Sequence, residues 1–389
     1  MTVKTSLRKV AGKKLRAVRK ALDSAPTPAE HTLSEILSQP ATWRETARQL
    51  EQQGMLELVS KVFFPGSPWL FLACGSSYYL SQLVATLWTR QLQVPCSAVP
   101  ASEFLFAPDE TLRRTGAQQV VLVSRSGETT EVLRAAKLLA ADRSILTLGV
   151  TCNAESPLEK LCARTLKLTW ANEKSTVMTR SFTSMLIAFE RLGAKFAGDL
   201  ELVSALDRLP EQVQPWLAAN AGKIQDFGEK RRFADFIFLG QGAHYWMAQE
   251  AGLKITEMSS SYAQVYHTLE FRHGPRSIAS RNTLITFLLS EAAAEEETLL
   301  VSEMKELGAA TFVVTNRATE ALERASDLLI ELRMDEPEFA RLAPTAIPAQ
   351  LLGAAVGLRK GLNPDAPKNL SRVVTLDPNG SGAVKRRGA

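Results

Sequence analysis

The 389-residue chain has few of the residues and runs that mark several protein classes. Its four cysteines and four histidines follow neither a disulfide framework nor a metal-binding spacing, so the cysteines are expected to be reduced core residues. No run reaches about 18 apolar residues, which predicts no membrane-spanning helix. The start of the chain lacks a signal-peptide pattern, so the expected compartment is the cytoplasm. Hydrophobic residues make up 45% and charged residues 22%, which indicates a folded chain of two or three domains.

The net charge of +5 is unevenly distributed. Residues 1–24 contain eight lysines or arginines and one aspartate, a balance of +7 that leaves −2 for the rest of the chain. A nucleic-acid-binding protein usually carries its basic patch on the folded domain. We therefore expect solvated ends rather than a nucleic-acid or membrane partner, although an electrostatic contact of this basic arm with either is the alternative.

The chain divides into five predicted segments, most of them in an α/β pattern. These are a basic arm and linker (1–31), a helical lead-in (32–64), a first α/β domain (65–205), a second (206–360) and a C-terminal tail (361–389). Short apolar runs that alternate with helix-like sequence predict strands at 69–73, 120–123, 145–150, 236–239, 284–289 and 311–314. Continuous apolar strands between helices favour parallel sheets that are covered on both faces.

An internal repeat supports this division. The segment 71–78 aligns with 238–245, and 121–124 aligns with 287–290, so that Ser124 is paired with Ser290. A third match joins 149–153 to 313–316, in the same order and at nearly the same offset. The sequence therefore predicts two copies of one α/β module, joined by helical sequence near 200–230.

Two loops of the first module have the composition of anion-binding loops. Gly75-Ser76-Ser77 follows one predicted strand, and Ser124-Arg125-Ser126-Gly127-Glu128-Thr129 follows another. A helix N-terminus offers free N–H groups to an anion, and serine and threonine add hydroxyl donors. Helix capping alone is the simpler interpretation. In the second module the aligned residues 290–293 are followed by three glutamates, which would repel a phosphate.

The second module contains candidate acid–base residues. Lys254 and Glu257 are three residues apart, so they share one face of a predicted helix, where a plain surface ion pair is the alternative. His273 precedes a Gly-Pro pair that predicts a turn. A histidine near a carboxylate can form an acid–base pair, although a structural histidine fits the same pattern.

These motifs resemble those of the double sugar-isomerase-domain (SIS) proteins that act on phosphosugars. The resemblance covers roughly residues 40–376 and includes a third segment at 172–182, with Thr176 and Thr179 as candidate substrate-binding residues. It implies that the loops with Gly75, Ser76, Ser77, Ser124, Arg125, Ser126 and Thr129 hold a sugar phosphate. The reaction that the resemblance implies needs no metal and no organic cofactor.

The series 250–257 with 271–275 resembles the isomerase half of glucosamine-6-phosphate synthase. By this resemblance Glu257 moves a proton between C1 and C2 of an open-chain sugar, and Lys254 positions or tunes it. His273 assists ring opening, in the site of a neighbouring subunit in some relatives, which implies a homodimer with a shared active site.

Two departures from the synthase matter. No catalytic cysteine or glutamine-hydrolysing domain precedes the first module, so a built-in ammonia source is not expected. Arg372, a candidate substrate-binding residue in the tail, falls where the synthase has a lysine thought to form an imine with the ketose. A guanidinium stays protonated and cannot form that imine.

These departures favour the stand-alone members: aminosugar-6-phosphate deaminase/isomerases, or the related tagatose-6-phosphate ketose/aldose isomerases. The prediction is an enzyme that deaminates glucosamine- or galactosamine-6-phosphate. The alternatives are a simple ketose/aldose isomerase, a deglycase that releases a larger amine, and a non-catalytic regulator that binds a sugar phosphate.

Overall fold

The computed structural model describes residues 27–375, so the basic arm at 1–24 and the end of the tail at 376–389 lie outside the described residues. The described part begins with three helices, of which the second and third pack on the first module and the first packs on α15 (Ile347–Arg359) of the second. They are α2 (Glu30–Leu37), α3 (Gln39–Gln52) and α4 (Met55–Ser60). The segment predicted as a helical lead-in is thus helical over most of its length.

The first module is a parallel five-stranded sheet in the order β2-β1-β3-β4-β5. Its strands are β1 (Trp69–Ala73), β2 (Cys96–Pro100), β3 (Gln119–Val123), β4 (Leu146–Thr151) and β5 (Arg164–Lys167). Its helices are α5 (Ser76–Leu92), α6 (Ala101–Phe106), α7 (Pro108–Thr115), α8 (Thr130–Leu139), η1 (Pro157–Lys160), η2 (Thr169–Ala171) and α9 (Arg180–Ala197). Strands β1 and β3 are buried at every residue, as expected for strands covered on both faces.

The second module repeats this plan in the order β10-β9-β8-β6-β7, again all parallel. Its strands are β6 (Asp235–Gly240), β7 (Ala263–His267), β8 (Thr283–Leu288), β9 (Ala310–Thr315) and β10 (Leu328–Glu331). Its helices are α11 (Ala243–Ser259), η3 (Leu269–Arg272), η4 (Pro275–Ile278), α12 (Ala294–Glu306), α13 (Glu320–Ala325), α14 (Leu342–Thr345) and α15 (Ile347–Arg359). The predicted fold class and repeat are confirmed.

The strand register corrects one detail of the predicted repeat. Ala73 pairs with Val123 in the first sheet, and Gly240 pairs with Leu288 in the second. The residue after the strand is therefore Ser124 in one module and Leu289 in the other, and both donate their N–H to the next strand at 3.0 Å. The sequence alignment of Ser124 with Ser290 was wrong by one residue, because it followed letter identity rather than strand ends.

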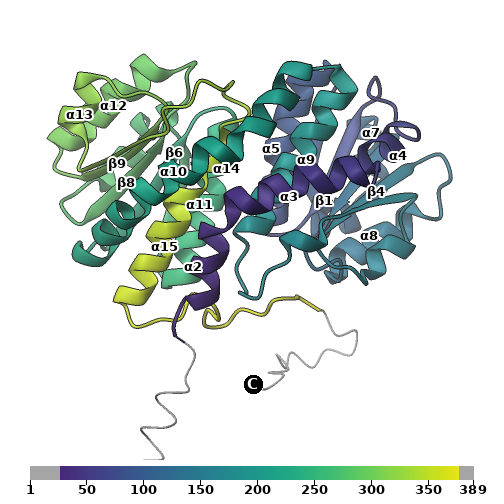
Figure 1. Cartoon of the computed structure of the whole chain (residues 1–389), viewed down its shortest axis with the longest axis horizontal. Helices are drawn as coiled ribbons and strands as arrows, with labels where there is room; N and C mark the ends of the chain where they lie inside the picture. The colour runs from purple at the N-terminus through teal and green to yellow at the C-terminus, as the bar shows by residue number, and fades with distance from the viewer. Residues whose placement is uncertain (1–26, 376–389) are drawn as a thin grey trace, which may run out of the picture.

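The helix α10 (Leu200–Lys230) joins the modules and crosses the molecule between them (Figure 1). It packs on α3 and α9 of the first module and on α15 of the second. Pro210 and Pro215 lie inside this helix, where each removes one backbone hydrogen bond. The predicted boundary between residues 205 and 206 falls within α10.

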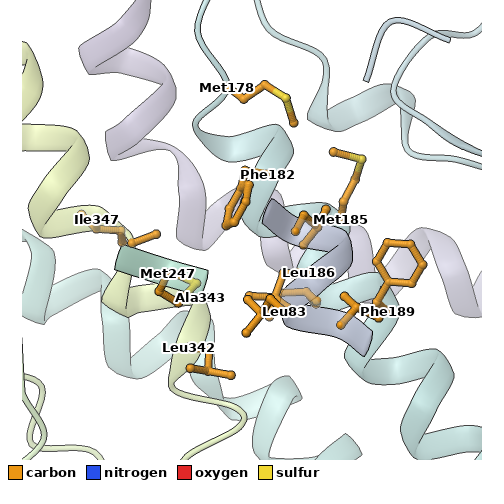
Figure 2. Close-up of a cluster of buried hydrophobic side chains, with 14 of the residues drawn as sticks. Leu83, Met178, Phe182, Met185, Leu186, Phe189, Met247, Leu342, Ala343 and Ile347 are labelled. Atoms are coloured by element: carbon orange, nitrogen blue, oxygen red, sulfur yellow. The ribbon is translucent and has the colours of Figure 1, made fainter. Parts of the chain in front are cut away.

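The two modules share one hydrophobic core. Figure 2 shows Leu83 of α5 and Phe182 of α9 close to Met247 of α11, with Leu342 of α14 and Ile347 of α15 beside them. These side chains belong to one cluster of buried residues that extends into both sheets. Because burial of apolar surface is the main stabilising contribution, this core fixes the modules relative to each other.

The four cysteines are free. Only Cys152 is buried, whereas Cys74, Cys96 and Cys162 are half-buried, so the expected core position holds fully for one of them. No helix between residues 27 and 375 combines the length and apolar character needed to cross a membrane.

Candidate active site

The first anion-binding candidate is the turn between β1 and α5. Gly75 has φ 56° and ψ −135°, a backbone conformation that favours glycine because it lacks a Cβ. The turn places Ser76 and Ser77 in the first turn of α5, where both are buried. Gly242 has nearly the same conformation before α11, which confirms that part of the repeat. The N-terminus of α5 is thus aimed at the carboxyl edge of the first sheet.

The second candidate is the loop between β3 and α8, and its own side chains hold its shape. The Ser124 hydroxyl lies 2.9 Å from the Thr129 hydroxyl and accepts the Gly127 N–H at 3.0 Å. The Ser126 hydroxyl accepts the N–H of Glu128 at 3.2 Å. Gly127 has φ 65°, and a Cβ there would lie 1.8 Å from the hydroxyl oxygen of Ser156. The loop therefore requires glycine at this position for both its φ and its close packing.

A cavity of about 180 Å³ lies between these two loops. Six of the predicted substrate-binding residues line it, namely Gly75, Ser77, Arg125, Ser126, Thr129 and Arg372. The carboxylate of Glu131 also faces this cavity, and its buried Oε2 has no hydrogen-bond partner in the described part of the chain. A second cavity of about 220 Å³ shares Ser126 and Arg372 with the first. The structure thus brings the two loops together at the carboxyl ends of β1 and β3.

Arg125 connects the second loop to the third segment and to the tail. Its guanidinium donates to the carbonyl of Thr176 at 2.9 Å and to the carbonyl of Arg372 at 3.1 Å. It also lies 3.6 Å from Oε2 of Glu173, and both side chains are buried. Arg125 therefore holds the tail against the cavity as well as lining it.

Thr176 and Thr179 lie outside the cavity lining and make structural contacts. Thr179 is fully buried, and its hydroxyl donates to Glu173 at 2.7 Å. The N–H of Thr176 donates to the carbonyl of Asp365 in the tail at 3.0 Å. In this structure both threonines stabilise the segments around the cavity and do not line it.

The acid–base candidates lie on α11, against the first module. Lys254 is fully buried, and its Nζ lies 2.5 Å from Oε2 of Glu257 and 3.2 Å from Oε1 of Glu250. The same Nζ donates to the hydroxyl of Ser76 at 3.1 Å. The candidate base in one module and the candidate anion loop in the other are thus linked through one ammonium group. Glu257 remains open to a ligand, since 18% of its side chain is exposed.

Burial and charge act in opposite directions on this cluster. Burial raises the pKa of Glu250 to about 7, and the nearby ammonium of Lys254 only partly offsets this increase. Burial alone would lower the pKa of Lys254, but the two carboxylates outweigh it and leave this pKa raised. Lys254 is therefore charged at neutral pH and stabilises an ionised carboxylate beside it.

Glu250 is the one member of this cluster to which the sequence analysis gave no role. Positions 250, 254 and 257 are four and three residues apart, so they share one helical face. That spacing alone places Glu250 next to Lys254 on the helix. Its complete burial follows from helix packing and was not visible in the spacing.

His273 lies apart from this cluster. It ends η3, just before Gly274 with φ 123°, so the predicted turn is present. The imidazole is exposed, and among residues 27–375 it makes no hydrogen bond or ion pair with Glu250, Lys254 or Glu257. The structure therefore brings Lys254, Glu257 and the first loop together within one chain, and leaves His273 outside.

The described residues contain no group of three or more histidine, cysteine or acidic side chains placed to hold a metal ion. The chemistry that the arrangement supports is proton transfer by a carboxylate beside a fixed cation, with an anion held at two helix N-termini.

Comparison with known proteins identifies the family. The SIS domain model matches residues 69–194 and 234–354, which are the two α/β modules. The chain therefore belongs to the SIS domain family, as its motifs predicted.

The chain is similar to larger proteins named glutamine–fructose-6-phosphate aminotransferase (isomerizing). It is 28% identical over 347 residues to the one from Methanothermobacter thermautotrophicus, covering 89% of this chain and 57% of that protein. It is 30% identical over 330 residues to the one from Thermosynechococcus vestitus, covering 79% of this chain and 51% of that protein. The chain thus spans little more than half the length of these relatives.

Solved structures give a closer match in length. A glucosamine-6-phosphate deaminase from Thermotoga maritima has a TM-score of 0.74 and 28% identity, over 89% of this chain and all of that chain. A tagatose-6-phosphate ketose/aldose isomerase from Escherichia coli has a TM-score of 0.77 over 87% of this chain and 98% of that chain. At 18% identity this second match is a likeness of fold alone.

Proposed function

We propose that the chain is an aminosugar-6-phosphate deaminase that converts glucosamine- or galactosamine-6-phosphate and water into a ketose 6-phosphate and ammonia. The contact between Lys254 and Ser76 carries this proposal, because it places the acid–base cluster beside the anion-binding loop. The full-length match to a glucosamine-6-phosphate deaminase at 28% identity supports the same reaction.

The proposed reaction starts with the open-chain aminoaldose, held by its phosphate at the N-termini of α5 and α8. Glu257 takes the proton from C2 and returns it to C1, which turns the aldehyde and amine into a 2-imine through an enolamine. Water then adds to C2 and ammonia leaves, so the net change is one water consumed and one ammonia released. The phosphate anchor keeps C1 and C2 near the carboxylate throughout.

Arg372 helps to decide between deamination and the aminotransferase reaction. It lines the cavity, and its guanidinium donates to Oδ1 of Asn172 at 2.5 Å. It cannot act as the amine that forms an imine with a ketose, so we do not propose the aminotransferase reaction of the larger relatives. Its position suits recognition of the phosphate or a sugar hydroxyl.

The exposure of His273 supports a homodimer with a shared active site. Within one chain it does not reach the Lys254 cluster. We propose that His273 from a second copy of the chain enters the site and assists ring opening. A C2 dimer would complete two such sites at once.

The test is to follow ammonia and ketose phosphate with glucosamine-6-phosphate and galactosamine-6-phosphate as substrates. Wild type should release both products in equal amounts from one of them. Glu257→Gln should reduce kcat by at least about 100-fold, since a positioned acid–base group contributes about that much or more. Glu229→Gln, the same change at an exposed position of α10, is the matched control and should leave kcat unchanged.

Ketose–aldose interconversion without ammonia would replace this proposal with the simple isomerase. An inactive wild type that still binds the sugar phosphates would contradict both and favour the regulator or the deglycase.

A further inference from the structure

The second module contains a cavity at the position that the anion site occupies in the first. Its volume is about 290 Å³, and it lies at the carboxyl ends of β8 and β9. His244, Glu291 and Glu338 line it together with Arg341. His244 follows Gly242 as Ser77 follows Gly75, and Glu291 corresponds to Ser126 by strand register. The cavity is therefore the repeat's counterpart of the proposed phosphosugar site.

The loop at this cavity disfavours a phosphate because the chain's own carboxylates accept the hydrogen-bond donors of Ser290 and Glu291. Glu297 accepts the N–H of Ser290 at 2.8 Å and its hydroxyl at 3.0 Å. Glu338 accepts the N–H of Glu291 at 2.8 Å. A phosphate would lie beside the Glu338 carboxylate, so we expect a ligand without a phosphate.

The charges around the cavity leave one carboxylate without a cationic partner. Arg341 is paired with Glu291, and Arg317 is paired with Asp335. Among residues 27–375, Glu338 has no lysine or arginine within 4.0 Å. An ammonium group is the complement of such a carboxylate.

His244 supplies an unused polar group in the same cavity. Only 6% of this residue is exposed, yet among the described residues neither of its ring nitrogens makes a hydrogen bond. Its Nδ1 lies 3.8 Å from Oε1 of Glu338, which is too long for one. Burial lowers the pKa of His244, so the ring is neutral and offers one donor and one acceptor, as a hydroxyl requires.

We propose that this cavity binds a small polyhydroxylated amine without a phosphate, with its ammonium at Glu338 and a hydroxyl at His244. Its volume is near the lower end of small-molecule sites, about 300 Å³, which suits one sugar ring. The cavity is thus a second ligand site, separate from the proposed active site. The ligands of the two proposed sites would belong to the same class of sugar, but only the ligand of the first site carries a phosphate.

The test is isothermal titration with free glucosamine, and with glucose as the probe that lacks the ammonium. Wild type should bind one glucosamine per chain and bind glucose at least about tenfold more weakly. Glu338→Gln should weaken glucosamine binding at least about tenfold, while its amide oxygen can still accept the N–H of Glu291. Ala294→Leu, at an exposed lining position, should block the cavity without changing its charges.

Ser126→Ala, in the first module, is the control and should leave glucosamine binding unchanged. No saturable glucosamine binding to wild type would overturn the proposal. Binding that survives Glu338→Gln and Ala294→Leu but is lost in Ser126→Ala would also overturn it, because the ligand would then occupy the first module. The titration requires no turnover, so its outcome is independent of the proposed deaminase activity.

Discussion

Lys254 is a fully buried cation between two carboxylates, and this determines its role. An ion that is removed from water is stable only when its partners replace the lost hydration. Glu250 and Glu257 provide that replacement, and Ser76 adds a hydroxyl. Removing the ammonium would leave the two carboxyl groups on one helical face without the cation between them.

We therefore expect Lys254→Met to lower the free energy of unfolding by about 3–5 kcal/mol at pH 8. Glu250 has a pKa of about 7, so at pH 5.5 it is protonated and the loss should be smaller. Urea unfolding at both pH values measures this difference. Lys223→Met, at an exposed position of α10, is the control, and an equal loss at both pH values would contradict the electrostatic explanation.

Glu190 is a buried carboxyl group. Neither of its oxygens has a hydrogen-bond partner among residues 27–375, and burial raises its pKa well above the usual value. A carboxyl group with a raised folded-state pKa favours folding below its unfolded-state pKa. That contribution is lost as the pH rises toward the folded-state value.

Glu190→Gln should therefore become more stable than wild type as the pH rises from 5 to 8. The gain amounts to about 1.4 kcal/mol for each pKa unit of the shift that the pH change spans. Thermal or urea unfolding across this range is the measurement. A constant difference between variant and wild type would show that Glu190 is ionised in the folded protein.

Spacing alone predicted the pairing of Lys254 with Glu257, because residues three apart on a helix are always neighbours. It could not predict that the side chain of Lys254 is buried or that its third partner is Ser76, 178 positions away. Those facts depend on how α5 and α11 pack.

At the scale of elements, the sequence revealed the centre of each sheet and missed its edges. All six predicted strands are central ones, namely β1, β3, β4, β6, β8 and β9. The four strands at the edges are β2, β5, β7 and β10. Central strands are covered on both faces and form continuous apolar runs, whereas edge strands such as β7 are half-exposed and mixed in composition.

The loop before α8 gives a prediction at the same scale. Gly127→Ala should strain the backbone by about 1–3 kcal/mol, because φ is 65° and the new Cβ would meet Ser156. Since Ser126 and Thr129 are placed by this loop, the KM for the sugar phosphate should rise at least about tenfold. Gly66→Ala is the control for steady-state kinetics and should match wild type, because among the described residues the new Cβ would have only its chain neighbours within 4 Å.

At the scale of the whole molecule, the site depends on the contact between two modules. Helices α5 and α11 pack together, and the shared core around Phe182 and Met247 keeps them in place (Figure 2). Each module alone has only part of the candidate site: the first has the candidate anion loops, and the second has Glu257.

The proposed dimer can be tested by mixing inactive subunits. If His273 acts in the site of the partner, a dimer of Glu257→Gln and His273→Asn subunits has one intact site and one doubly altered site. Random pairing of equal amounts should then restore about one quarter of wild-type activity. No recovery, with dimers present by size-exclusion chromatography, would place both residues in the same chain's site.

The sequence by itself determined the two α/β modules, their central strands, the glycine turns and the charged residues of the candidate site. These depend on local rules, such as hydrophobic periodicity, the conformations open to glycine and the neighbours on one helical face. Only the tertiary structure decided that Ser76 contacts Lys254, that Thr179 faces inward, and that the second module contains a cavity lined by His244 and Glu338. These depend on contacts between residues far apart in the chain, which follow from packing and burial rather than from spacing.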